Sequence, residues 1–171
     1  MSASVGDLVA PLQPWANALV QRASALGLQP RFTSTRRSHA EQKRLWSRAQ
    51  AGGSNFPVAP PGYSAHEYGE AFDLVASPYT LKTFRKLGSL WKSWRGGWGG
   101  AFHDPIHFEL PGASARAAAL GRVYQAHQSG ILDSLPGRLL RFYLEYFTTS
   151  IDVTPTSEQL QVLQKVTSSL R

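Results

Sequence analysis

The spacing of apolar residues predicts a helix near the start of the chain and a strand directly after it. Between residues 12 and 26 apolar side chains recur every three or four positions, the pattern of one helix face, and Gly27 can end the helix. These side chains are Leu12, Trp15, Leu19, Val20, Ala23 and Leu26. Residues 30–35 are β-prone and predict a strand with Arg36 and Arg37 at its end.

A second helix is predicted over residues 39–51. Ser38 can cap its first turn, and Glu41 stands three residues later in the capping-box position. The next segment, residues 52–63, is rich in glycine and proline and therefore predicts a loop.

Alternation with a period of two predicts two more strands, over residues 69–75 and 106–110. In the first strand Asp73 points away from the apolar face, and in the second His107 and Glu109 do the same. An apolar face therefore packs into a core while the polar face is left for a cleft.

Residues 78–94, between those strands, carry apolar positions at helical spacing and predict a third helix. The glycine-rich segment 94–102 that follows is predicted to be a flexible lip. Strands and helices alternate without the regular repetition of βαβ units, so the pattern favours an α+β fold.

Pro111 and Gly112 mark a boundary between a first domain, residues 1–111, and a C-terminal extension, residues 112–171. The extension is predicted to be helical over residues 113–127, 136–149 and 155–170. Cations and a strongly apolar surface are combined in its segment RLLRFYLEYF. Such a helix can dock on the first domain, lie on an anionic membrane or mediate self-association, and docking is the default.

The composition is that of a folded globule. With 171 residues, 42% of them hydrophobic, the chain is long enough to bury a core, and it has no cysteine for disulfides. It contains no run of about eighteen apolar residues. Its start lacks a basic segment followed by an unbroken apolar one. We therefore expect neither a membrane-spanning helix nor a signal peptide.

The formal net charge of +7 predicts attraction to polyanions, among them the acidic polymers of a bacterial wall, anionic lipid and nucleic acid. Lysine and arginine are spread along the sequence without a dense tract. Specific nucleic-acid binding is therefore not expected, and the pattern favours no particular oligomeric state.

Two short motifs carry the candidate chemistry, SAHEYGEAFD and HDPIHFEL. Together they supply His66, Asp73 and His107 as potential metal ligands, with Asp104 as an additional carboxylate. A catalytic zinc takes three protein ligands and leaves a position for water, whereas a structural zinc usually has four ligands that include cysteine. A neighbouring carboxylate can take a proton from that water and hand it to a leaving group. The pattern therefore predicts hydrolysis.

The remaining histidines are expected outside this set. His103 and His107 form an HxxxH pair, but Pro105 disfavours a continuous helix there, so His103 is expected at the rim. His39 and His127 lie on predicted helices without a partner motif and are expected to be structural.

Three motifs together resemble the family of zinc peptidoglycan peptidases that includes D-alanyl-D-alanine carboxypeptidases, L-alanyl-D-glutamate endopeptidases and many phage endolysins. The family pattern SxHxxGxAxD is met by Ser64, His66, Gly69, Ala71 and Asp73. The second pattern is met by Asp104, His107, Phe108 and Glu109, and the pattern RSxxxQ by Arg37, Ser38 and Gln42. The resemblance covers roughly Leu12 to Leu110.

The resemblance implies a Hedgehog/DD-peptidase-like domain, in which a small antiparallel sheet is flanked by helices, and a Zn²⁺ cofactor. It implies that His66, Asp73 and His107 are the zinc ligands and that Asp104 is the general base and acid. Many carboxypeptidases of the family use glutamate at that position, and aspartate resembles the endopeptidase branch.

Two further residues take roles from the resemblance. Arg37 corresponds to an arginine that polarises the scissile carbonyl, the alternative being a solvated cation at a helix start. Ser64 binds the substrate or orients His66, and a simple loop serine is the alternative. Gln42 and Glu109 are expected to support the site and not to react.

The sequence thus predicts a zinc metallopeptidase that hydrolyses an amide bond in the stem peptide of peptidoglycan. Asp104 and the small size favour an endolysin-like L-alanyl-D-glutamate endopeptidase. The alternatives are a D-alanyl-D-alanine carboxypeptidase and a non-catalytic wall-binding or virion protein on the same fold. We expect synthesis in the cytoplasm of a phage-infected host and action on the bacterial cell wall.

Overall fold

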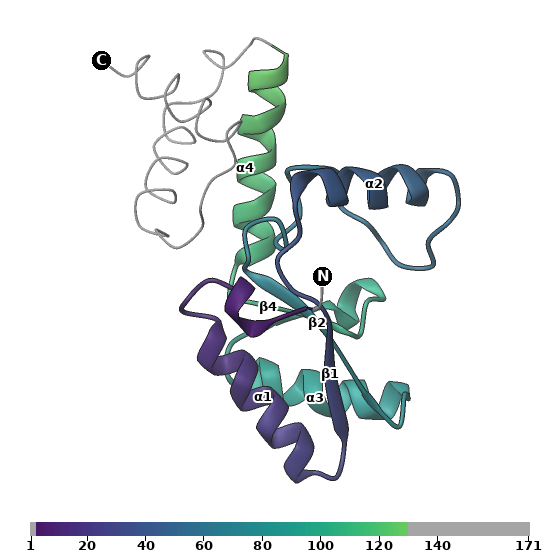
Figure 1. The fold of residues 1–171 in the computed structure, drawn as a ribbon, viewed down its shortest axis with the longest axis vertical. Coiled ribbons are helices and arrows are strands. Elements are labelled where there is room, and N and C mark those ends of the chain that lie inside the picture. Colours follow the sequence, from purple (N-terminus) through teal and green to yellow (C-terminus); the bar gives the residue numbers. More distant parts are fainter. Residues whose placement is uncertain (1–2, 130–171) are drawn as a thin grey trace.

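The structure, a computed structural model, describes residues 3–129, in which helices and strands alternate (Figure 1). The first elements are the 3-10 helix η1 (Val5–Asp7), helix α1 (Gln13–Ala25), strand β1 (Gln29–Ser34) and helix α2 (His39–Gln50). Next come strand β2 (Ala71–Ser77), helix α3 (Leu81–Ser93), strand β3 (Gly97–Trp98) and the 3-10 helix η2 (Gly99–Phe102). Strand β4 (His107–Glu109) and helix α4 (Ala113–Gln128) complete the described part.

The four strands form one antiparallel sheet in the order β1-β2-β4-β3. Strand β2 pairs with β1 on one side and with β4 on the other, so it crosses the middle of the sheet. A small antiparallel sheet flanked by helices confirms the predicted α+β class.

One face of the sheet forms the core. Phe72 of β2 and Phe108 of β4 are fully buried there, and their rings stack with centroids 5.5 Å apart. Trp91 of α3 meets Phe72 edge-on, with centroids 5.3 Å apart. Helices α1 and α3 lie together on this side of the sheet (Figure 1). Because side chains alternate along a strand, Asp73 and His107 leave the opposite face.

The predicted helix ends follow from local capping. The Ser38 hydroxyl accepts a hydrogen bond from the Glu41 backbone N–H, 3.2 Å away, which starts α2 where the sequence placed it. Helix α3 starts later than predicted, at Leu81, because Thr80 caps it through the Thr83 N–H. Helix α1 ends before Gly27, whose φ of 76° lies in the left-handed region.

The segment predicted as a flexible lip contains strand β3 instead. Gly97 and Trp98 pair with Glu109 and Phe108 of β4. A Cβ on Gly97 would lie 2.6 Å from the Glu109 side chain, and one on Gly88 of α3 would lie 2.2 Å from the Trp98 ring. Close packing therefore requires glycine at these positions, and composition alone does not distinguish this requirement from flexibility.

Helix α4 agrees with the first of the three predicted C-terminal helices. It contacts the preceding domain, since Arg116 Nε donates to Glu70 Oε2, 3.1 Å away. The other two predicted helices, with the segment RLLRFYLEYF, lie outside the described residues, and the domain boundary at residue 111 stays a prediction. None of the helices within residues 3–129 has the length and apolarity of a membrane span.

Candidate active site

The pairing of β2 with β4 brings two of the predicted metal ligands face to face. Asp73 and His107 are direct cross-strand partners, and Asp73 Oδ1 lies 3.4 Å from His107 Nδ1. Directly opposite residues of an antiparallel pair have their Cβ atoms about 5 Å apart. The strand register therefore sets the distance between these two side chains.

His66 reaches the same point from the loop between α2 and β2. Its carbonyl accepts hydrogen bonds from the N–H groups of Gly69 and Arg37, at 3.1 and 3.0 Å. Gly69 has a φ of 69°, so the turn that the sequence predicted at this glycine is confirmed. The His66 ring is buried, and its centroid lies 5.1 Å from that of His107.

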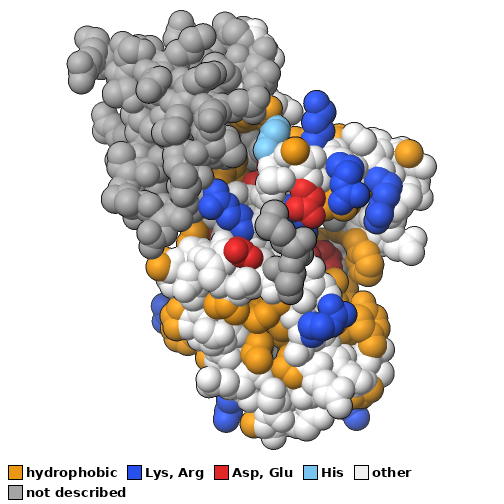
Figure 2. Space-filling view, in the orientation of Figure 1, with side chains coloured by type: hydrophobic (Ala, Val, Ile, Leu, Met, Phe, Trp, Pro, Cys, Tyr) orange, Lys and Arg blue, Asp and Glu red, His pale blue; other side chains and the backbone are white. Residues whose placement is uncertain are grey.

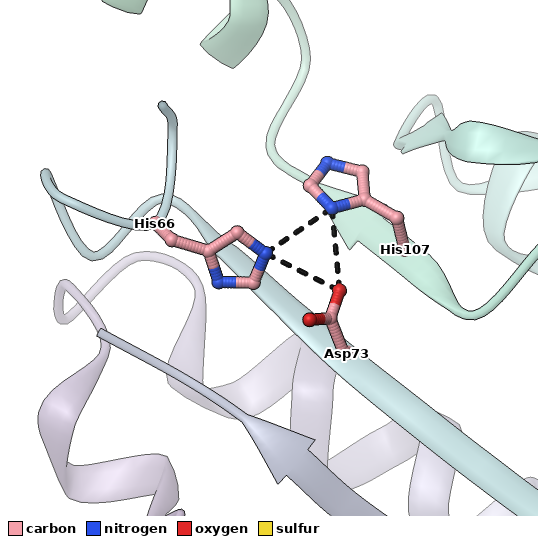
Figure 3. A group of neighbouring side chains, drawn as sticks. All are labelled: His66, Asp73 and His107. Atoms are coloured by element: carbon pink, nitrogen blue, oxygen red, sulfur yellow. Dashed lines mark hydrogen bonds and ion pairs between the residues drawn. The ribbon is translucent and has the colours of Figure 1, made fainter. Parts of the chain in front are cut away.

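Figure 3 shows the three side chains converging on one point. His66 Nε2 lies 3.2 Å from Asp73 Oδ1 and 3.2 Å from His107 Nδ1. Nitrogen and oxygen ligands about 2.1 Å from a tetrahedral zinc ion are roughly 3.4 Å from one another. The spacing of these atoms is therefore that of a zinc ligand set.

Hydrogen bonds behind the three side chains orient their electron pairs. His66 Nδ1 donates to the Thr35 carbonyl at 2.8 Å, and His107 Nε2 donates to Glu109 Oε2 at 3.1 Å. In the neutral imidazoles, the two nitrogens that face each other therefore carry lone pairs. Asp73 Oδ1 is buried and accepts no hydrogen bond. Three electron-pair donors directed at one point fit a metal cation.

The pKa values of these groups reflect their close contact. Burial lowers the pKa of His66. Burial by itself would raise the pKa of Asp73, but His66 and His107 beside it hold the value well below its ordinary range. Burial by itself would lower the pKa of His107, but Asp73 and Glu109 raise it to about 9. Without a metal this imidazole therefore carries a proton near neutral pH, and a metal ion would bind its neutral form by displacing that proton. Asp73 is therefore ionised and ready to bind a cation.

Two of the groups behind the imidazoles carry no clear signal in the sequence. The Thr35 carbonyl is a backbone atom, so no side-chain pattern indicates it. Ser114 Oγ donates to Glu109 Oε2 at 2.6 Å, although Ser114 lies beyond the last recognisable motif. Glu109 itself was expected to support the site, and its contact with His107 agrees with that expectation.

Arg37 lies beside Asp73. One of its terminal nitrogens donates to Asp73 Oδ2 at 3.3 Å and to Ser34 Oγ at 2.9 Å. The other donates to Gln42 Oε1, also at 2.9 Å. Gln42 is fully buried and supports the arginine, as expected for it. The role of Arg37 toward a substrate carbonyl stays a prediction.

A register shift in β1 contributes to this arrangement. Phe32 pairs with Leu74, but Ser34 pairs with Asp73, so the register shifts by one residue at Thr33. Because of this shift, Phe32 packs against the core while Ser34, two residues later, contacts Arg37 at the site. The sequence shows no sign of this irregularity.

Asp104 lines the same pocket as the three candidate ligands. Its Oδ1 is buried and has no hydrogen-bond partner within the described residues. Burial and then the negative charge of Asp73 raise the pKa of Asp104 to about 6. A carboxyl group with such a pKa can both take up and release a proton near neutral pH.

The pocket has a volume of about 270 Å³ and a largely apolar wall. The residues that form this wall are Leu45, Phe56, Pro57, Val58, Phe102 and Ile106. Ser64 also lines the pocket, where its N–H donates to Glu67 Oε2 at 3.3 Å. The role of the Ser64 hydroxyl toward a substrate stays a prediction.

Among the histidines whose side chains the structure describes, His39 and His103 lie outside the metal-binding group, as expected. His103 is exposed and ends η2 in the left-handed conformation, with a φ of 63°. His39 is hydrogen-bonded to Glu67 and Tyr124. The side chain of His127 lies outside the described part of the structure.

Two imidazoles and a carboxylate, with a second acid in the same pocket, define a metallopeptidase-type site. Residues 8–95 match the family model of D-alanyl-D-alanine carboxypeptidase, VanY, and the chain belongs to this family. It is therefore a zinc metallopeptidase acting on peptidoglycan, as the sequence predicted. Asp104 and His107 lie beyond the matched residues. No curated protein sequence matches the chain.

The chain is similar to two solved structures. One is VanYB in complex with D-alanine-D-alanine, with a TM-score of 0.50 and 22% identity, covering 78% of this chain and 85% of that one. The other is a Zn(II) complex of a mutant vancomycin resistance D,D-pentapeptidase VanY from a VanB-type resistance cassette. Its TM-score is 0.48 at 21% identity, over 69% of this chain and 78% of that one.

Proposed function

We propose that the protein hydrolyses the bond between L-alanine and D-glutamate in the peptidoglycan stem peptide. The observation that carries peptidase chemistry is the convergence of His66, Asp73 and His107 in one pocket with Asp104. A zinc ion bound there supplies a Lewis acid and lowers the pKa of water. The proposal assigns the rest of the chemistry to the side chains around it.

Asp104 is the group that moves the proton. As a carboxylate it accepts a proton from the attacking water, and it then donates that proton to the nitrogen of the leaving amine. Its position in the pocket and its pKa of about 6 support both steps. Arg37 holds Asp73, and the proposal assigns to it the stabilisation of the negative charge that develops on the carbonyl oxygen.

Asp104 supports the endopeptidase, because many carboxypeptidases of the family have glutamate at that position. A carboxypeptidase must bind the terminal carboxylate of its substrate, which calls for an available cation. Among the described residues that line the pocket, Arg37 alone has a permanent positive charge, and it already contacts Asp73. An endopeptidase that cleaves before D-glutamate meets a similar demand, because that residue keeps one free carboxyl group within the stem peptide. The charge of the pocket therefore does not separate the two activities, and the apolar wall at Phe56 and Val58 is available to apolar parts of the peptide in both cases.

A D-alanyl-D-alanine carboxypeptidase is the second candidate. The family match over residues 8–95 favours it, and VanYB, which has a similar fold, has been solved in complex with D-alanine-D-alanine. In this case Arg37 would have to bind the terminal carboxylate in addition to Asp73.

Digestion of purified peptidoglycan distinguishes the two activities. An L-alanyl-D-glutamate endopeptidase releases peptides with a new amino-terminal D-glutamate, whereas a carboxypeptidase releases free D-alanine. Mass spectrometry of the products, with and without a chelator, identifies the bond. Release of D-alanine alone would contradict the endopeptidase, and absence of any chelator-sensitive product would favour a non-catalytic wall-binding or virion protein.

We also propose that the enzyme is a phage lysis protein and that a cationic surface holds it on the wall. Figure 2 shows lysine and arginine side chains gathered over α2. Lys43, Arg44 and Arg48 are exposed on this helix, and none forms an ion pair with another described residue. Leu45, on the same helix, lines the pocket. An acidic wall polymer bound here would lie beside the site of cleavage.

A further inference from the structure

Helix α4 contacts the metal site at its first turn. Ser114 Oγ donates to Glu109 Oε2 at 2.6 Å, and the Ser114 N–H donates to Glu109 Oε1 at 3.4 Å. The same Oε2 accepts the hydrogen bond from His107 Nε2 at 3.1 Å. One buried carboxylate therefore connects α4 to the ring of a candidate metal ligand.

Helix α4 makes a second connection three turns later. The Tyr124 hydroxyl donates to His39 Nε2 at 3.0 Å, and His39 Nδ1 donates to Glu67 Oε1 at 2.9 Å. The other oxygen of Glu67 accepts from the N–H groups of Gly62 and Ser64, at 2.8 and 3.3 Å. A chain of hydrogen bonds thus runs from α4 into the turn just before His66.

Glu67 is well placed to fix that turn. It directly follows His66 in the sequence and is buried, with 5% of its surface exposed. A buried carboxylate is costly unless its oxygens are hydrogen-bonded, so the position of Glu67 depends on its partners. Loss of the His39 contact would leave one of its oxygens without a strong donor and would loosen the turn that it holds.

Close packing supports the same contact. A Cβ on Gly121 of α4 would lie 2.4 Å from the Tyr63 ring, so glycine lets the helix lie directly on the turn. The Tyr63 hydroxyl also donates to Gln125 Oε1 at 2.8 Å. Tyr63 lines the pocket, so α4 is in contact with the wall of the site as well as with the groups behind it.

We propose that α4 is the positioning element for both histidine ligands. Ser114 acts through Glu109 on the ring of His107, and Tyr124 acts through His39 and Glu67 on the turn that carries His66. The inference rests on the proposed metal site. It assigns a function at that site to a helix that lies outside the residues matched to the family.

A purely stabilising helix would behave differently. It would affect the unfolding temperature but not the affinity of the folded protein for a metal ion. Groups that orient a ligand ring change metal affinity, typically by 10- to 100-fold. Metal affinity is therefore the measurement that separates positioning from stability, and it needs no substrate.

The test compares Ser114→Ala and Tyr124→Phe with two matched controls. Ala115→Ser adds a hydroxyl at the neighbouring, exposed position and leaves Ser114 in place. Tyr79→Phe removes a hydroxyl from a tyrosine that is 63% exposed. The zinc dissociation constant is measured by competition with a chromogenic chelator, together with the absorption spectrum of the cobalt form. Thermal unfolding of the metal-free proteins is recorded in parallel.

Ser114→Ala is expected to weaken zinc binding about tenfold and to change the cobalt spectrum, with a smaller loss for Tyr124→Phe. Ser114→Thr, which keeps the hydroxyl, should restore binding, and both controls should bind like wild type. Equal affinity in all variants would overturn the inference even if unfolding temperatures fell. A wild-type protein that binds no zinc would overturn both the metal site and the positioning role.

Discussion

Arg37 and Asp73 form an ion pair, 3.3 Å between a guanidinium nitrogen and Oδ2, that leaves Asp73 Oδ1 facing the two imidazoles. One carboxylate oxygen of Asp73, Oδ2, contacts a permanent cation, and the other, Oδ1, is left to bind a metal ion. Both side chains are only 14% exposed, so the pair is screened less than a surface ion pair. Arg37 can therefore act in two ways: it can hold the metal ligand Asp73 in place, and it can stabilise the negative charge that develops on the substrate carbonyl.

Replacement of Arg37 by lysine separates these effects. Lysine keeps a positive charge but lacks the planar fork that contacts Asp73, Ser34 and Gln42 together. We expect kcat to fall by roughly 100-fold even at saturating zinc, because a charge directed at the developing oxyanion is displaced. Steady-state kinetics over a zinc titration measures this. Full recovery of kcat by added zinc would limit Arg37 to holding Asp73.

Replacement of Asp104 by asparagine should remove activity and leave the metal in place. The amide is similar in shape but cannot take up a proton, so we expect turnover to fall by roughly 10² to 10⁴-fold. Metal analysis of the purified variant should give the wild-type zinc content. Asp104→Glu, which keeps the acid, should recover part of the activity. Near-normal turnover in the zinc-loaded asparagine variant would exclude Asp104 as the general base.

The acid side of the pH profile should also depend on Asp104. The general base must be ionised, and the pKa of Asp104 is raised to about 6 by burial and by Asp73. A bound cation favours the carboxylate, so the loss of kcat/KM on acidification should occur at or below about pH 6. The profile of the weakly active Asp104→Glu variant should show a displaced acid limb. If the acid side of the kcat/KM profile stayed at the same pH in this variant, the titrating group would be one other than Asp104.

The sequence predicted most of this site because its chemistry lies in side chains with recognisable spacing. His66, Asp73 and His107 stand in motifs, and alternation along β2 and β4 places two of them on one face. The register that makes Asp73 and His107 opposite partners depends on long-range strand pairing, which spacing within one strand does not indicate. The contacts to Thr35 and Ser114 were not predicted for the same reason.

Glycines mark the other difference between the sequence and the structure. The pattern correctly indicated turns at Gly27 and Gly69, both of which have positive φ. It misread the glycines around Trp98, because the need for glycine there comes from the close approach of other groups, such as the Glu109 side chain at Gly97, and not from backbone conformation.

Gly88→Ala tests this packing requirement. Alanine is favoured over glycine in a helix by about 1 kcal/mol, so an open position would gain stability. A Cβ at Gly88, however, would lie 2.2 Å from the Trp98 ring, and overpacking of a core costs about 1–3 kcal/mol or more. We expect the free energy of unfolding to fall by about 1 kcal/mol in urea titrations. The exposed neighbour Ser89→Ala is the control. Stabilisation by Gly88→Ala would show that Trp98 moves aside freely.

Neutralising the cationic surface of α2 should weaken attachment to the wall without changing the chemistry. In the double variant Arg44→Gln and Arg48→Gln, two exposed charges beside the pocket are lost. Such attraction is screened within about 8 Å at physiological salt, so the wild-type advantage should shrink as salt is added.

Co-sedimentation with purified cell walls over a salt series measures this effect, and hydrolysis of a small soluble stem peptide reports the chemistry. We expect weaker wall binding at low salt and an unchanged rate on the soluble peptide, because neither arginine lines the pocket. The matched control is Lys82→Gln with Lys86→Gln, which removes two exposed charges from α3. Equal losses in the two double variants would mean that net charge, and not the surface of α2, holds the enzyme on the wall.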